Sequence, residues 1–300
     1  MRRKILLLGF ILCGISPSVF AQFNSSTTMW YAAPAEKWEE ALPVGNGRLG
    51  AMYFGGVSED RLQFNEETYW TGSPYSTVVK GAYRKLPEIQ QLLFGGRSIE
   101  AHLLFGKYLL GYPVEQQKYQ SMGNVILSFA DKSEVTDYRR ELDLKTGIAR
   151  VTYTQNGIHF KREVFASYPD QAVVMRLSAD KQGVISFECQ LQGVRNQAHS
   201  NYATDYFHTD LWGNNGLRLT GKGADYLGIE GKIRYEARLK ARLKGGRAST
   251  SIRSLYVQDA DEVVLILVAA TSFKSYKDVD GNCRRRVEDY FSHLAGLDYE

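Results

Sequence analysis

Cysteine is scarce in this sequence of 300 residues, which contains only Cys13, Cys189 and Cys283. Lipidation of Cys13 is disfavoured, because Leu12 occupies the position where a small residue is needed. Cys189 stands among alternating apolar residues and is expected to be a small buried hydrophobe. An oxidising compartment would permit a bond between Cys189 and Cys283, but sequence does not supply the geometry that a disulfide requires. That bond is therefore left open.

Several kinds of functional pattern are also missing. No G-x-S-x-G elbow is present, so a hydrolase nucleophile of that type has no candidate. After the first 21 residues no apolar run approaches the roughly 18 residues that a transmembrane helix needs, so no membrane span is expected. We expect no cofactor and no zinc site, because the histidines have no metal-ligand spacing with cysteine or acid. They are His102, His159, His199, His208 and His293.

The amino-terminal segment predicts export. Residues 2–4 are basic, residues 5–15 form a short apolar run, and residues 19–21 place small side chains where a signal peptidase reads. This pattern is typical of a secretory signal peptide over residues 1–21, with cleavage before Gln22. We therefore expect a mature chain in the periplasm or the medium.

Removal of that segment also removes most of the net charge. The sequence has 37 Lys and Arg against 33 Asp and Glu, and three of the basic residues lie in the signal peptide, which leaves 34 against 33. This balance gives no reason to expect nucleic acid as a partner. About 279 residues remain, enough for one large all-β domain or two ordinary domains.

Alternating apolar and polar residues predict an all-β fold. The alternation is clear over 185–191 and over 233–243, where the second segment carries a basic face that we expect to be solvated. Asn156-Gly157 stands between two β-rich runs and favours a hairpin. A large antiparallel β-sandwich is therefore predicted over residues 22–275. Further strands are expected at 48–55, 60–66, 124–130, 171–178, 216–220, 251–257 and 262–270.

Two helical segments interrupt the strands. The first is an insertion near 87–110, where Gly95-Gly96 ends one helix and Ser98 can cap a second that buries Leu104, Phe105 and Tyr108. The second lies within residues 276–300, whose apolar residues follow the spacing i, i+3, i+4, i+7. We expect the start of a helical linker there, with the apolar stripe covered by a part of a longer protein. The alternative is a helix packed back on the sandwich.

Residues 44–51 read VGNGRLGA and match the spacing G-x-G-x-x-G. A dinucleotide loop needs a buried strand before the first glycine and a helix after the last. Here the preceding segment is polar and contains Pro43, and two further glycines follow closely. The context therefore excludes a nucleotide loop and favours a hairpin in which residues 48–56 pair with 58–67.

The second strand of that hairpin leads into FNEETYWTGSP, residues 64–74. Amides and carboxylates pair with sugar hydroxyl groups, and aromatic rings stack on pyranose faces, so this mixture suits a carbohydrate. The alternative is that Tyr69 and Trp70 belong to the core and the acids to the surface. Composition by itself favours that alternative.

A longer series of segments resembles the amino-terminal domain of glycoside hydrolase family 95, the α-L-fucosidase family. The segments are residues 29–75, YQSMGNVILSF at 119–129, residues 138–181 and residues 261–282, which together span most of the mature chain. The resemblance implies a large β-sandwich followed by a helical linker, an (α/α)6 barrel and a small β domain. It also implies hydrolysis of terminal α-1,2-linked L-fucose, or of α-L-galactosides, with inversion.

In that family the catalytic glutamic acid, and the aspartate and asparagines that help to activate the water, lie in the barrel. None of those positions maps onto this chain, so whether the chain alone is an enzyme stays open, and the barrel is the expected partner. Loops of the sandwich are expected to wall the pocket for a fucosylated glycan. The candidate binding residues are Asn46, Arg48, Asn65, Glu66, Thr68 and Trp70. The rival hypothesis is a stand-alone carbohydrate-binding or structural β-sandwich.

Overall fold

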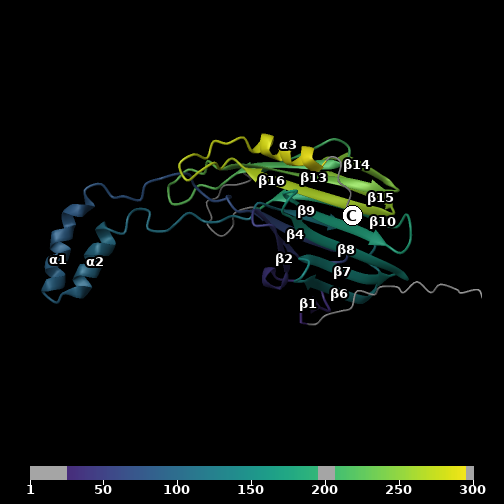
Figure 1. The fold of residues 1–300 in the computed structure, drawn as a ribbon, viewed down its shortest axis with the longest axis horizontal. Coiled ribbons are helices and arrows are strands. Elements are labelled where there is room, and N and C mark those ends of the chain that lie inside the picture. Colours follow the sequence, from purple (N-terminus) through teal and green to yellow (C-terminus); the bar gives the residue numbers. More distant parts are fainter. Residues whose placement is uncertain (1–25, 195–206, 295–300) are drawn as a thin grey trace, which may run out of the picture.

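The computed structural model describes residues 26–194 and 207–294, so the expected signal peptide lies outside the described residues. Two antiparallel sheets pack face to face and form a sandwich, as the sequence predicted (Figure 1). The larger sheet contains, in spatial order, β1 (Thr28–Tyr31), β6 (Val135–Asp143), β7 (Ile148–Gln155), β8 (Ile158–Ser167), β9 (Ala172–Ala179), β16 (Glu262–Thr271), β13 (Arg234–Lys244), β12 (Gly216–Lys222) and β11 (Phe207–Leu211). The smaller sheet contains β14 (Arg247–Ser251), β15 (Ser254–Ala260), β10 (Ile185–Gly193), β5 (Gly123–Ser128), β4 (Glu59–Glu66), β3 (Leu49–Tyr53) and β2 (Leu42–Gly45).

The core lies between the two sheets and follows from the alternation in the strands. Ile185, Phe187, Cys189 and Leu191 of β10 are all buried, which confirms the two-residue period read from the sequence. The inward side chains of β4, β7 and β13 join the same cluster. Because successive side chains of a strand point to opposite faces, each strand contributes one row to this core and leaves one row outside.

Two hairpins form where the sequence predicted them. Asn156 and Gly157 adopt φ angles of 53° and 74° between β7 and β8, which is the conformation that favours Asn-Gly in a two-residue turn. β3 pairs with β4 from Leu49 opposite Glu66 to Tyr53 opposite Leu62. The expected strand at 251–257 is wrong in its bounds, because a turn that contains Ile252 at φ 57° separates β14 from β15.

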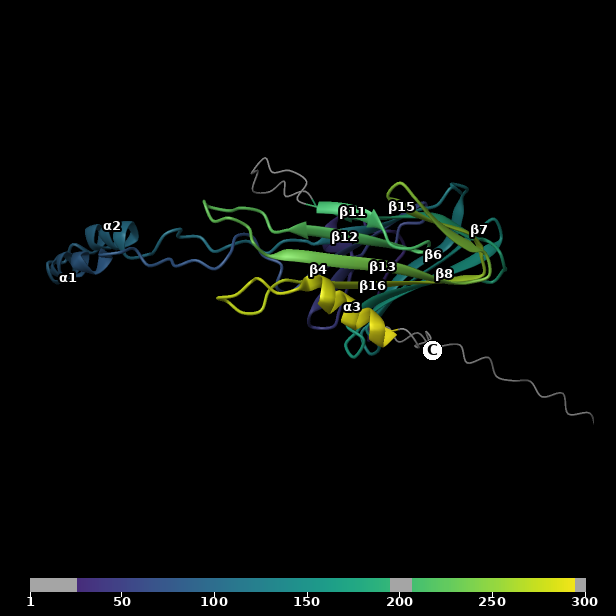
Figure 2. The same cartoon turned by 90° about the horizontal axis from the view of Figure 1, so that it is seen from above.

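The helix α3 (Cys283–His293) packs back on the outer face of the larger sheet (Figure 2). Val287 and Leu294 are buried against Ile266 and Val268 of β16, with Tyr290 and Phe291 beside them. The larger sheet therefore covers the apolar stripe, as in the alternative of a helix packed back on the sandwich. The stripe needs no further part of a longer protein to cover it.

The same helix corrects the expectation of a solvated basic face on β13. Arg238 and Glu236 are buried beneath α3, where the Arg238 guanidinium lies 2.6 Å from the Glu236 carboxylate and 3.1 Å from that of Glu288 on the helix. The Trp212 and Phe291 rings close the contact with their centroids 4.8 Å apart. Paired charges and aromatic rings thus occupy the face that the alternation assigned to solvent.

The helices α1 (Leu86–Phe94) and α2 (Ser98–Tyr108) form a helical pair at the predicted insertion, preceded by the 3-10 helix η2 (Ala82–Lys85). A further 3-10 helix, η1 (Trp38–Glu40), precedes β2. Figures 1 and 2 show the helical pair standing away from the sandwich on two long connections. Phe105 is 42% exposed, contrary to the expectation that it is buried, because α1 and α2 pack on each other and stand away from both sheets. Ser98 is the first residue of α2 and its side chain does not cap the helix, so that expectation is also wrong.

A buried ion pair crosses the core. The Arg162 Nη1 of β8 donates to Asp60 Oδ2 of β4 at 2.9 Å, and Arg162 Nη2 donates to the Tyr153 hydroxyl at 2.7 Å. Tyr53 also donates its hydroxyl to Asp60, at 3.0 Å. Both Nη atoms of Arg162 and both carboxylate oxygens of Asp60 are therefore hydrogen-bonded, as a buried charge requires.

A row of alternating charges lies on the outer face of the larger sheet. The residues Glu141, Arg150, Glu163 and Arg176 stand directly opposite one another on β6, β7, β8 and β9. Arg150 contacts Glu141 at 2.8 Å and Glu163 at 3.1 Å, and opposite charges facing each other across strands stabilise a sheet.

Both described cysteines are free thiols. Cys189 lies in the core on β10, and Cys283 begins α3 on the outer face of the other sheet. Burial raises the pKa of both thiols above their ordinary value.

Candidate functional site

The predicted site residues lie within or next to several connections that meet at one end of the sandwich. The helical pair departs from the same end (Figure 2). We call this region the loop end and define it by residues 67–76, 115–122 and 223–233. Backbone hydrogen bonds join the three segments: Thr71 N donates to Lys118 O at 2.9 Å, and Gly72 N donates to Ala224 O at 2.9 Å. Residues distant in sequence are thus held together at one rim.

Asn46 shapes the turn between β2 and β3, which is the VGNGRLGA segment. Its Oδ1 accepts from the backbone N–H groups of Arg48 at 3.1 Å and Leu49 at 2.8 Å, and its Nδ2 donates to Ser167 O at 2.7 Å. Gly47 has φ 91°, a conformation that glycine adopts without strain. A strand follows this turn, so the structure confirms that the glycine spacing does not build a nucleotide loop.

Arg48 ties that turn to both sheets and to α3. Its Nε donates to Gln171 Oε1 at 2.6 Å, and its Nη1 donates to Ala269 O of β16 at 2.6 Å. The guanidinium also stacks on Tyr290 of α3, 4.7 Å from the ring centroid. A planar guanidinium with five donors suits such a junction better than lysine would.

Glu66 is buried and fully engaged. Its Oε2 accepts from Thr68 N at 2.8 Å and from Thr68 Oγ1 at 2.6 Å, while Oε1 lies 3.5 Å from Arg48 Nη1. The Thr68 hydroxyl also contacts the Thr271 hydroxyl at the end of β16. With 4% of its surface exposed, Glu66 holds the start of the loop end in place and is not presented to a ligand.

Trp70 and Tyr119 form the exposed part of the site. Their ring centroids are 5.3 Å apart, and the two side chains are 40% and 45% exposed. Trp70 Nε1 donates to Glu67 O at 3.0 Å, which fixes the indole. Burial raises the pKa of the Tyr119 hydroxyl, against the opposing effect of a side-chain hydrogen bond with Asn65. Asn65 Oδ1 also accepts from Met122 N at 3.3 Å.

The six predicted residues thus divide into two layers. Asn46, Arg48, Glu66 and Thr68 form a polar network in which Asn46 and Glu66 are buried and Arg48 and Thr68 half-buried. Asn65 is half-buried beside this network, and Trp70 is exposed. The alternative that placed Tyr69 in the core is right for that residue, which is buried with its ring 4.8 Å from Tyr235. It is wrong for Trp70, which is 40% exposed, and for Glu66, whose carboxylate is buried.

Four residues that contact the predicted site residues were not predicted from the sequence: Tyr119, Gln171, Thr271 and Tyr290. Thr271 lies at the end of β16 and Tyr290 on α3, whereas Tyr119 and Gln171 lie in connections between elements. All four are distant in the chain from the residues they contact, and no spacing in the sequence marks them. Gln171 does carry a structural signature, a φ of 53° at the start of β9, in a region that residues other than glycine seldom adopt.

The described residues include no group of three or more His, Cys, Asp or Glu side chains placed to hold a metal ion. Within the same ranges, no helix is long and apolar enough to cross a membrane. The arrangement at the loop end offers amide, hydroxyl and aromatic groups over a rigid base, which are the groups that bind a polar ligand with apolar faces.

Comparison with known proteins identifies relatives of the whole sandwich. Alpha-L-fucosidase 2 of Arabidopsis thaliana is 32% identical over 259 residues, which cover 81% of this chain and 30% of the relative. Probable alpha-fucosidase A of Aspergillus niger (strain ATCC MYA-4892 / CBS 513.88 / FGSC A1513) is 26% identical over 276 residues, which cover 87% of this chain and 32% of the relative. The chain thus spans about a third of the length of these relatives.

Among solved structures, a putative kojibiose phosphorylase from the human microbiome aligns with a TM-score of 0.46 at 12% identity, over 91% of this chain and 36% of the other. The fucosidase names of the sequence relatives agree with the resemblance found in the sequence. Residues 29–276, most of the chain, match the family described as Glycosyl hydrolase family 65, N-terminal domain. This chain therefore belongs to that family of glycoside hydrolase amino-terminal domains.

Proposed function

We propose that this chain is the amino-terminal domain of an exported glycoside hydrolase that removes terminal α-1,2-linked L-fucose from a glycan with inversion. The two sequence relatives described above are named as fucosidases, and each extends well beyond the region matched here. In this proposal the sandwich supports a catalytic barrel in the same polypeptide, and its loop end forms part of the wall of the substrate pocket.

The observation that supports a role of the loop end in the pocket wall is an exposed aromatic pair on a rigid base. Arg48 and Glu66 hold the start of the loop end through partly buried hydrogen bonds, and Trp70 and Tyr119 stand exposed beside it. A binding side chain is effective when its own position is fixed by packing and hydrogen bonds. A sugar ring stacked on Trp70 would find the Asn65 amide beside it.

The chemistry itself is proposed to lie in the barrel. Inversion needs two carboxyl groups roughly 6.5–9.5 Å apart on opposite faces of the sugar, one to protonate the leaving oxygen and one to activate water. Glu66 does not suit either role, because Thr68 and Arg48 occupy both of its oxygens. The 300-residue chain alone is therefore expected to release no fucose.

The helical pair supports a second contact with the barrel. Phe94, Ile99 and Leu103 are exposed on α1 and α2, although these helices already pack on each other. Apolar side chains gathered on a projecting element typically mark a contact surface. We assign this one to the remainder of the same polypeptide.

Two measurements test the proposal. The first is whether the reading frame continues past Glu300 into a barrel-sized segment. The second is release of fucose from 2′-fucosyllactose by the 300-residue chain and by the product of the full reading frame. We expect activity only in the longer product. Fucose release by the 300-residue chain, at a rate that survives Glu66→Gln and Glu67→Gln, would contradict the proposal.

A stand-alone carbohydrate-binding sandwich is the second candidate, favoured by the exposure of Trp70 and Tyr119 in the chain itself. A reading frame that stops at Glu300, together with glycan-array binding that Trp70→Ala abolishes, would establish it in place of the first.

Export is tested by recovering the protein from periplasm and medium. Amino-terminal sequencing should begin at Gln22, and a recovered chain that keeps residues 1–21 would refute the signal peptide.

A further inference from the structure

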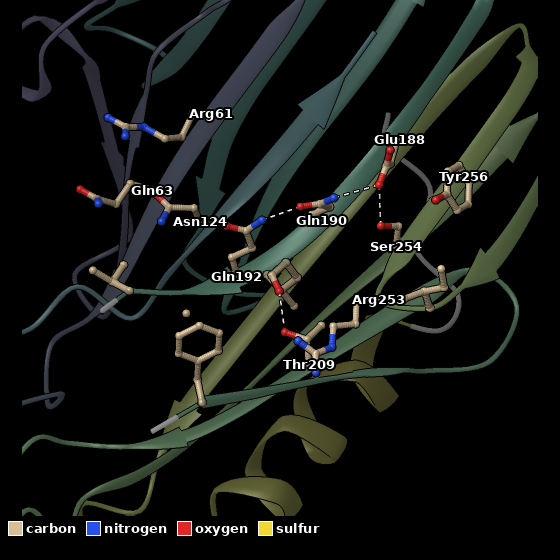
Figure 3. A pocket seen from close by; sticks show the side chains of 15 residues that line it. Arg61, Gln63, Asn124, Glu188, Gln190, Gln192, Thr209, Arg253, Ser254 and Tyr256 are labelled. Atoms are coloured by element: carbon tan, nitrogen blue, oxygen red, sulfur yellow. Dashed lines mark hydrogen bonds between the residues drawn. The ribbon is translucent and has the colours of Figure 1, made fainter. Parts of the chain in front are cut away.

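A groove of about 850 Å³ lies on the outer face of the smaller sheet, away from the core (Figure 3). Its floor is formed by outward side chains of β4, β5, β10 and β15. Its rim is formed by Phe207 and Thr209 of β11 and by Ile252 and Arg253 in the turn between β14 and β15. Thr209 Oγ1 donates to Leu191 O at 2.8 Å, which holds the rim strand against β10.

Side-chain amides line this floor, and the strand register sets their order. Gln63, Asn124 and Gln192 stand opposite one another on β4, β5 and β10, and Gln190 follows on the same face of β10. We call the hollow the amide groove. Amide groups both donate and accept hydrogen bonds, so such a floor can pair with hydroxyl groups in either sense.

A hydrogen-bonded chain orients these amides. Gln192 Nε2 donates to Gln190 Oε1 at 2.5 Å, Gln190 Nε2 donates to Glu188 Oε1 at 2.9 Å, and Ser254 Oγ donates to the same Glu188 oxygen at 2.6 Å (Figure 3). The bonds from Ser254 and Gln190 hold the pKa of Glu188 below its ordinary value, so it stays a carboxylate at neutral pH. The hydrogen-bonded chain of amides thus begins at a fixed acceptor, the Glu188 carboxylate.

One polar atom in the floor is left without a protein partner. Asn124 Oδ1 is buried and accepts no hydrogen bond from the described residues. An unsatisfied buried acceptor costs free energy, which favours a rotation of the Asn124 amide that presents its oxygen to a donor from a ligand.

Apolar surface is present beside the amides. Gly193 allows the Phe207 ring to lie against the floor, because a Cβ at Gly193 would stand 2.3 Å from Phe207 Cγ. Tyr256 lines the other side, and the Arg61 guanidinium stacks on Phe54 with 3.6 Å to the centroid. Charges of both signs are present, with Glu188 opposing Arg61 and Arg253, so the lining does not select a polyanion.

We propose that the amide groove binds a neutral oligosaccharide. The volume falls within the range of ligand pockets, roughly 300–1,000 Å³, and the lining combines fixed amides, one carboxylate and aromatic edges. The groove starts close to the loop end, because Asn65 follows Gln63 on the same face of β4. It is nevertheless a second binding surface, and it stands whether or not the loop end walls a catalytic pocket.

The test measures binding to the 300-residue chain by isothermal titration calorimetry. The probes are 2′-fucosyllactose, lacto-N-fucopentaose and cello-oligosaccharides, with a heparin-derived oligosaccharide as the sulfated probe. The variants are the double substitution Gln190→Ala with Gln192→Ala, and the single substitution Asn124→Ala. Gln258→Ala is the matched control, since Gln258 is an amide exposed on β15 beyond the groove lining. Trp70→Ala reports binding at the loop end, and circular dichroism shows that each variant is folded.

We expect a neutral probe to bind, and the double variant to weaken that binding by about tenfold or more, since two hydrogen-bonding groups are lost. Gln258→Ala should leave that affinity unchanged. The proposal is overturned if no neutral probe binds, if only the sulfated probe binds, or if Trp70→Ala abolishes binding while the double variant does not. None of these binding results decides whether the product of the full reading frame is a fucosidase. The two proposals can therefore fail independently.

Discussion

The guanidinium of Arg162 lies 2.9 Å from the carboxylate of Asp60 in the middle of the sandwich, where the two side chains are 2% and 1% exposed. The pair joins β8 of the larger sheet to β4 of the smaller sheet. It therefore links the two layers by charge and hydrogen bonds within the apolar core.

Removing one partner of this pair should destabilise the fold strongly. Asp60→Ala leaves the Arg162 charge buried without a counter-ion, and we expect a loss of about 3–5 kcal/mol in the free energy of unfolding. Urea unfolding followed by circular dichroism measures it. Glu100→Ala, which removes the exposed partner of Arg97 on α2, should leave the midpoint unchanged. Equal midpoints for the two variants would show that the buried pair contributes nothing.

The environment of Glu163 predicts how the free energy of unfolding depends on pH. Burial opposes its ionisation, but hydrogen bonds from Lys161 and Arg150 outweigh burial and lower the pKa of Glu163. Because the pKa of Glu163 is lower in the folded state, its contribution to the free energy of unfolding is complete above the unfolded-state pKa, about 4.3. That contribution is lost as the pH falls through the folded-state pKa. The stability advantage of the wild type over Glu163→Gln should therefore be constant from pH 7 to about pH 5 and shrink in more acidic solution.

Urea titrations across that pH range measure this difference. Glu134→Gln, at an exposed position before β6, serves as the control. An advantage over Glu163→Gln that grows on acidification would reverse the sign and contradict the account.

The packing of α3 on the larger sheet can be tested at Val287, which is fully buried against β16. Val287→Ala removes two methyl groups and should cost about 2 kcal/mol. Hydrogen exchange should show faster exchange in α3 while the strands keep their protection. Unchanged exchange in α3 would mean that the helix does not depend on this contact.

The parts of the fold that the sequence predicted are those that local patterns determine. Asn156-Gly157 makes its hairpin because those two residues tolerate positive φ, and the alternation in β10 decides which side chains enter the core. Strand order could not be predicted, because it joins β16 to β9 and β13 across long stretches of chain.

Two of the wrong expectations share one cause: the residues on one face of an element do not record which other element covers that face. The outer residues of β13 alternate as a solvated row would, yet α3 covers Arg238. Phe105 has the spacing of a buried residue, yet the helical pair has no sheet beneath it.

The same limit applied to the candidate site. The mixture of residues in 64–74 indicated the right region, but only the fold separates buried Glu66 from exposed Trp70. Tyr119 reaches Trp70 from a strand connection about fifty residues away, and nothing near either residue in the sequence records that contact.

The central claim, that the loop end walls the substrate pocket of a fucosidase, is tested most directly by Trp70→Ala in the product of the full reading frame. Its kcat/KM for 2′-fucosyllactose should be compared with that of Trp38→Ala, which removes a tryptophan of similar exposure, 52%, outside the loop end. An aromatic ring on which a nucleic-acid base stacks contributes roughly 1–3 kcal/mol. With a similar contribution from a sugar stacked on Trp70, we expect kcat/KM to fall about tenfold or more with an unchanged melting temperature. A kcat/KM equal to that of the Trp38→Ala variant would contradict the claim.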